Sequence, residues 1–175
     1  MGTGYSLKCR KCGYGFSANL GVGFMFPLAY RETMEAGKTG KLGKKVKRFL
    51  EEHPDGVLDC SSVILQCSEC GALGCGPDLS MYVPGEDTPP LSSGNWSVAF
   101  PHEGVSCVAP WHLERYKLFG LYDHRCKECK GKMKVIKEKE FEQLIRGADA
   151  DHSPTKIPCP ECREPLWLDE MLMWD

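Results

Sequence analysis

Long apolar runs are missing from this sequence of 175 residues. No stretch approaches the roughly 18 apolar residues that a membrane-spanning helix needs. Residues 2–6 (Gly-Thr-Gly-Tyr-Ser) follow Met1 and do not form the apolar core of a secretory signal. We therefore expect a cytoplasmic protein without a membrane partner.

A strong charge of one sign is also missing, because the formal net charge is only −2. The charges are unevenly distributed, however. Residues 1–58 carry ten Lys and Arg against five Asp and Glu, whereas residues 59–175 carry twelve against nineteen. This distribution excludes a chain that is basic throughout and wraps a long duplex, and it leaves the N-terminal third as the place for an anionic partner.

The basic residues of this third gather in one predicted helix, residues 42–52. Leu42, Val46, Phe49 and Leu50 fall on one helical face. The other face carries the candidate residues for an anionic partner, which are Lys41, Lys44, Lys45, Lys47 and Arg48. A solvated amphipathic helix is the simpler interpretation, since no aromatic residues that stack on bases are interleaved with these lysines.

Cysteine is abundant, and eight of the eleven cysteines form four Cys-x-x-Cys pairs. The pairs are Cys9/Cys12, Cys67/Cys70, Cys126/Cys129 and Cys159/Cys162. A two-residue turn points both sulfurs of such a pair at one ion, and paired thiols without a secretory signal are typical of metal ligands rather than disulfides. Four-thiolate sites select zinc or iron–sulfur chemistry. We predict two such sites with two Zn²⁺ ions, and iron is the alternative metal.

The sequence does not fix which pairs combine. Elements that are adjacent in sequence are usually adjacent in space, so we expect the first pair to combine with the second and the third with the fourth. The main alternative combines the second pair with the third. His124, beside the third pair, is expected as a surface side chain rather than a ligand.

The pairs and their flanking residues resemble the knuckles of the zinc-ribbon superfamily. The resemblance rests on residues 8–16 (Lys-Cys-Arg-Lys-Cys-Gly-Tyr-Gly-Phe), 66–71 (Gln-Cys-Ser-Glu-Cys-Gly) and 158–162 (Pro-Cys-Pro-Glu-Cys). It covers the four pairs and their flanking strands, and it implies a zinc-ribbon protein of the bacterial kind. The Cys-Gly-Tyr of the first pair and the 29-residue gap between the last two pairs are also similar to rubredoxins. However, the third and fourth pairs continue with Lys130 and Arg163 where rubredoxins carry glycine, which argues against iron.

The expected fold class is α+β. Small antiparallel β ribbons would carry the two four-cysteine sites, with short helices inserted between the pairs. Besides the basic helix, helices are predicted over residues 28–36 and 138–146, and a strand over residues 57–66 leads into the second pair.

Two domains are expected. Residues 1–83 would form an N-terminal zinc ribbon with the basic helical insertion, and residues 96–175 a C-terminal ribbon with a short helical insertion. Pro and Gly punctuate residues 84–95, which we interpret as a linker or long loop.

Cys60, Cys75 and Cys107 remain outside the pairs. A lone cysteine is usually a small buried hydrophobe. Cys107 has His102 and His112 near it in sequence, and a cysteine nucleophile needs such a base within hydrogen-bond reach.

These patterns favour a protein that is not an enzyme. A closed four-cysteine site leaves no open position on the metal, so the metal itself would not catalyse. We expect two structural zinc ions holding a scaffold that binds a protein or a nucleic acid, with no catalytic residues and no evident small-molecule substrate. The alternatives are a rubredoxin-like electron-transfer protein with iron and a thiol-dependent enzyme that uses Cys107.

Overall fold

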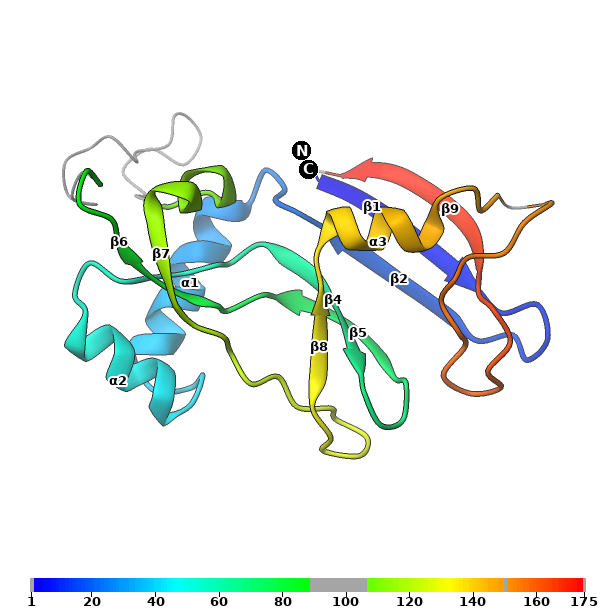
Figure 1. The fold of residues 1–175 in the computed structure, drawn as a ribbon, viewed down its shortest axis with the longest axis horizontal. Coiled ribbons are helices and arrows are strands. Elements are labelled where there is room, and N and C mark those ends of the chain that lie inside the picture. Colours follow the sequence, from blue (N-terminus) through cyan, green and yellow to red (C-terminus); the bar gives the residue numbers. More distant parts are fainter. Residues whose placement is uncertain (1, 89–106, 150, 175) are drawn as a thin grey trace. The chain divides into compact units, whose positions relative to one another are not determined.

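The computed structural model describes residues 2–88, 107–149 and 151–174. Small antiparallel sheets and short helices give an α+β architecture, as the sequence predicts (Figure 1). The chain divides into two compact units. Unit 1 contains Met1–Gly23, Ser62–Gly76 and Asp123–Asp175, and unit 2 contains Phe24–Ser61 and Pro77–Tyr122.

This division differs from the expected halves 1–83 and 96–175, because both ends of the chain belong to unit 1. The first residues of the expected linker are also tied down within unit 2. The amide of Gly85 donates to the carbonyl oxygen of Arg115 at 3.0 Å, and the Thr88 hydroxyl donates to the same oxygen at 2.6 Å. Residues 89–95 lie outside the described residues.

Unit 1 contains two three-stranded sheets. In the first, β1 (Gly2–Lys8) lies between β2 (Gly15–Leu20) and β9 (Trp167–Trp174). The N-terminal and C-terminal strands therefore run side by side, antiparallel, from the pair Gly2↔Trp174 to the pair Lys8↔Trp167 (Figure 1). In the second sheet, β4 (Ser62–Cys67) lies between β5 (Leu73–Pro77) and β8 (Met133–Ile136).

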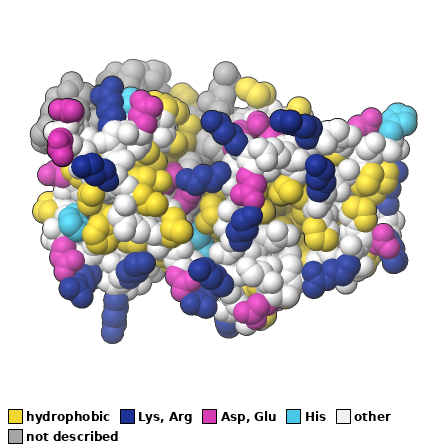
Figure 2. Space-filling view, viewed as in Figure 1, with side chains coloured by type: hydrophobic (Ala, Val, Ile, Leu, Met, Phe, Trp, Pro, Cys, Tyr) yellow, Lys and Arg dark blue, Asp and Glu magenta, His cyan; other side chains and the backbone are white. Residues whose placement is uncertain are grey.

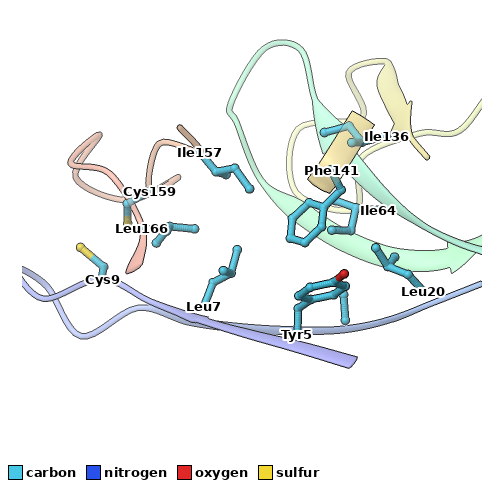
Figure 3. Packing of buried hydrophobic residues seen from close by; sticks show 11 residues of the cluster. Tyr5, Leu7, Cys9, Leu20, Ile64, Ile136, Phe141, Ile157, Cys159 and Leu166 are labelled. Carbon is cyan, nitrogen blue, oxygen red and sulfur yellow. The ribbon is translucent and has the colours of Figure 1, made fainter. Parts of the chain in front are cut away.

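Helix α3 (Glu138–Ile145) contributes Phe141 to an apolar core in unit 1. The Phe141 ring is fully buried and meets the Tyr5 ring edge-on, with 4.8 Å between the ring centroids. Figure 3 shows the two rings together with Leu7 of β1 and Ile64 of β4. The same core includes Cys9 and Cys159, so the packing of unit 1 continues into its cysteine pairs (Figure 3).

Among its described residues, unit 2 combines two α-helices with a third sheet. The helices are α1 (Phe26–Lys38) and α2 (Lys44–Glu52), and the sheet has the order β3 (Val57–Leu58), β6 (Met81–Pro84), β7 (Tyr116–Gly120). A short 3₁₀ helix, η2 (Pro110–Arg115), leads into β7. The predicted apolar face of α2 is confirmed, because Val46, Phe49 and Leu50 are its buried residues.

The strand predicted over residues 57–66 is interrupted. Residues 57–58 form β3 of unit 2, and residues 62–67 form β4 of unit 1. Between them, the Asp59 carboxylate accepts a hydrogen bond from the backbone amide of Ser61 at 3.0 Å. Aspartate side chains that bond the backbone two residues on are typical of turns, which explains the break.

Within the described part of the chain, no helix has the length and apolar character that crossing a membrane requires.

Candidate metal centres

The four Cys-x-x-Cys pairs share one backbone conformation. We call each pair with its two following residues a knuckle. In every knuckle the amide of the first cysteine donates to the carbonyl five residues on, and its own carbonyl accepts from the amide four residues on. These eight hydrogen bonds measure 2.7–3.1 Å. These backbone hydrogen bonds close the turn of each knuckle in the same way.

The residue directly after the second cysteine is left-handed in all four knuckles. Its φ is +79° at Gly13, +80° at Gly71, +62° at Lys130 and +66° at Arg163. Lys130 and Arg163 thus adopt the conformation that glycine supplies in the other two knuckles. The departure from the glycine pattern of rubredoxins therefore leaves the knuckle backbone unchanged.

The first group of sulfurs, site 1, brings the first knuckle together with the fourth. Cys9 Sγ lies 3.4 Å from Cys162 Sγ, and Cys12 Sγ lies 3.6 Å from Cys159 Sγ. All four sulfurs lie within 4.8 Å of one another.

The second group, site 2, brings the second knuckle together with the third. Cys67 Sγ lies 3.4 Å from Cys129 Sγ, and Cys70 Sγ lies 3.7 Å from Cys126 Sγ. These four sulfurs also lie within 4.8 Å of one another.

The spacing in both groups suits a tetrahedral ion. Zinc bound to sulfur at about 2.3 Å places neighbouring sulfurs about 3.8 Å apart, close to the separations in sites 1 and 2. A disulfide would need sulfurs about 2 Å apart. Each group can therefore hold one metal ion through four thiolates.

The expected sequential combination of the pairs is wrong. The observed arrangement is nested: site 2 uses the second and third pairs, the alternative left open by the sequence, and site 1 uses the outer two. Strand pairing gives the reason. β1 enters the first knuckle and β9 leaves the fourth, and these strands pair along their length. Likewise β4 enters the second knuckle and β8 leaves the third, with Cys67 opposite Met133.

Side chains of the first knuckle also contact the fourth knuckle and the start of β9. The Arg10 guanidinium lies over the Trp167 ring, 3.7 Å from the ring centroid. Lys11 Nζ lies 2.9 Å from the Glu164 carboxylate. Cationic side chains close to four thiolates offset part of the negative charge that remains when a divalent ion binds four sulfurs.

The backbone of the knuckles also favours thiolates. The amide of Cys12 hydrogen-bonds to the Cys9 sulfur and lowers the pKa of that thiol to about 7. The amide of Cys70 does the same at Cys67 and lowers its pKa to about 6. Since the thiolate is the form that ligates metals, the lowered pKa values of Cys9 and Cys67 favour metal binding at one sulfur of each site.

Sites 1 and 2 are adjacent within unit 1. A Cβ built on Gly71, directly after Cys70 of site 2, would lie 2.8 Å from Nη1 of Arg163, directly after Cys162 of site 1. The Arg163 guanidinium therefore occupies the space beside Gly71. The side chain of His124, which was expected at the surface, is buried.

The three remaining cysteines differ from one another. Cys60 is buried, and its Sγ donates to the Leu58 carbonyl oxygen at 3.4 Å. Cys107 is also buried, and burial raises the pKa of its thiol, which disfavours the thiolate that a nucleophile needs. His102 lies outside the described residues. Cys75 is exposed, so the prediction of a buried hydrophobe is wrong there.

The basic residues predicted to bind an anionic partner lie on or next to α2. Lys41, Lys44, Lys45, Lys47 and Arg48 are all exposed. Phe119 of β7, which is not among the predicted binding residues, also lies beside this helix, with its ring centroid 5.0 Å from that of Phe49. No local signal places Phe119 there, because it is 70 residues away from Phe49 in the sequence.

No protein-family model, curated protein or solved structure matches the chain.

Proposed function

We propose that the protein is a zinc-ribbon-like interaction module, in which two structural zinc ions hold unit 1 and a basic face of unit 2 binds the partner. The observation that supports it most is the closure of both sites: each provides four thiolates around one centre. A four-thiolate zinc site has no position for water or substrate, so its role is to stabilise the fold.

Metal analysis of the purified protein tests the structural part of the proposal. We expect two zinc ions per chain and a colourless protein. Cys9→Ser removes a buried ligand of site 1 and should lower the content to about one ion, because a three-thiolate remnant binds zinc far more weakly. Cys75→Ser is the matched control, since it also removes a thiol but leaves both sites complete. A red protein that contains iron, or a metal content unaffected by Cys9→Ser, would contradict the proposal.

The binding part of the proposal rests on the charge of α2. Its exposed face is basic, and phosphate or carboxylate groups are the partners that such a face attracts. A heparin column provides a simple polyanion for the test. We expect Lys44→Glu combined with Arg48→Glu to lower the salt concentration at which the protein elutes. Lys139→Glu combined with Arg146→Glu, which reverses the same number of charges at exposed residues of unit 1, should leave elution nearly unchanged. Equal shifts in both variants would mean that α2 is not the binding face.

A further inference from the structure

The basic face of α2 borders a pocket in unit 2 that is not purely polar. The α2–β7 pocket has a volume of about 440 Å³. It is lined by Lys44, Lys45, Arg48, Phe49, Glu52 and Phe119. Figure 2 shows apolar side chains with Lys and Arg around them in the region where Figure 1 places α2 and β7. A volume of this size lies within the range of small-ligand pockets in proteins and is large enough for a nucleobase.

Two of the lining residues are aromatic, Phe49 and Phe119, and the His53 ring lies next to them. The Phe119 centroid lies 5.0 Å from that of Phe49 and 4.9 Å from that of His53. Phe49 is 2% exposed, whereas Phe119 is 50% exposed. The Phe119 ring therefore packs against a buried ring and still presents an aromatic surface to solvent.

The charged side chains at the pocket carry a net positive charge. Lys45 Nζ donates to the Leu121 carbonyl oxygen at 3.1 Å, which holds the ammonium near β7. Arg48 and Glu52 form an ion pair at 2.7 Å, and this pair accounts for the one carboxylate at the pocket. Lys44 makes no ion pair among the described residues. Two ammonium groups thus remain to attract an anion beside the exposed ring.

We propose that the α2–β7 pocket binds single-stranded nucleic acid, with one base stacked on Phe119 and the neighbouring phosphates contacting Lys44 and Lys45. An exposed aromatic ring flanked by cations is the combination that proteins use for unpaired bases, since every base has a π face and every nucleotide a phosphate. A duplex would offer only its phosphates, because its bases are already stacked. An acidic peptide would use the cations and leave the ring unused. This inference rests on the proposed binding face and names its partner.

Fluorescence anisotropy with two labelled probes tests the assignment. One probe is an oligothymidine of about 12 nucleotides, and the other is an abasic strand with the same number of phosphates. Phe119→Ala should weaken oligothymidine binding by roughly tenfold through loss of the stacked base, and should leave binding of the abasic strand unchanged. Lys44→Glu should weaken the binding of both probes and reduce the salt dependence of both, because a phosphate contact is lost.

Two further variants separate the role of the ring from a packing defect. Phe119→Leu retains an apolar side chain but has no aromatic face, so it should behave like Phe119→Ala. Phe119→Trp should bind oligothymidine at least as tightly as the unsubstituted chain. Met173→Ala, an exposed apolar residue of unit 1, is the matched control and should have no effect.

Three results would overturn the inference. These are equal affinity for the two probes, oligothymidine binding that Phe119→Ala and Phe119→Leu leave intact, or tighter binding of an oligoglutamate peptide than of oligothymidine. In each case the heparin and metal results can still stand. Failure of the pocket and failure of the proposed function are therefore distinguishable.

Discussion

At the scale of single residues, the knuckles show what the cysteines require of their neighbours. The residue after each second cysteine must be left-handed, and glycine adopts this conformation without the steric cost that a Cβ adds. Glycine supplies it twice, and Lys130 and Arg163 supply it at that cost. The eight paired cysteines are recognisable from their spacing alone. The left-handed conformation of Lys130 cannot be recognised from the sequence, since a lysine rarely adopts it elsewhere.

Lys130→Gly should stabilise the metal-loaded protein by about 1 kcal/mol, because it removes the Cβ from a left-handed position. Gly13→Ala should destabilise it by about the same amount. The second change isolates the conformational effect, since nothing lies within 4 Å of a Cβ built on Gly13. Urea unfolding of the zinc-loaded variants measures both. If Lys130→Gly proves destabilising, the contact of Lys130 Nζ with the Lys127 carbonyl oxygen at 2.9 Å outweighs the strain.

At the scale of helices and strands, the local spacing of apolar residues predicts an element correctly where that element buries one apolar face. The three helices occur close to their predicted ranges, and β4 leads into the second knuckle as expected. The pairing of strands was not predictable in this way. Nothing local in residues 167–174 indicates that they pair with residues 2–8, and this pairing decides which cysteines meet. For the same reason the local sequence does not indicate that Phe119 lies beside α2, because this placement follows from the position of β7.

The turn from α2 to β3 depends on Gly56. A Cβ at this position would lie 2.9 Å from the carbonyl oxygen of His53 and 2.7 Å from the end of the Phe49 ring. The carbonyl belongs to the backbone and cannot move aside easily. We expect Gly56→Ala to destabilise the protein by roughly 1–3 kcal/mol through this overpacking.

Thermal unfolding measures the effect of Gly56→Ala, and Gly15→Ala is the matched control. Gly15 has an ordinary φ and no atom within 4 Å of a built Cβ, so its substitution should change stability by less than about 0.5 kcal/mol. Similar losses of stability in the two variants would show that steric crowding at Gly56 does not explain the need for glycine in this turn.

At the scale of the whole molecule, the nested arrangement places both candidate metal sites in one unit. All eight paired cysteines belong to the segments of unit 1, and none belongs to unit 2. Sequential combination would have given each half of the chain its own site. With the observed arrangement we expect unit 1 to depend on metal, whereas unit 2 has buried residues of its own, which include Tyr30, Val46, Leu58 and Met81.

Removal of metal should therefore unfold unit 1 and leave unit 2 folded. Binding energy at a structural zinc site is folding energy, and each of the two sheets of unit 1 has one of the sites at the end of its strands. Helices α1 and α2 of unit 2 have 13 and 9 residues, whereas α3 of unit 1 has 8. Treatment with a chelator should thus retain most of the helical circular dichroism. Hydrogen exchange should at the same time become fast in β1, β4, β8 and β9 and stay slow in α1 and α2.

Restoring zinc should return the slow exchange of the strands. Loss of protection in both units at the same chelator concentration would show instead that the chain folds as one cooperative body, with unit 2 as dependent on the metal as unit 1.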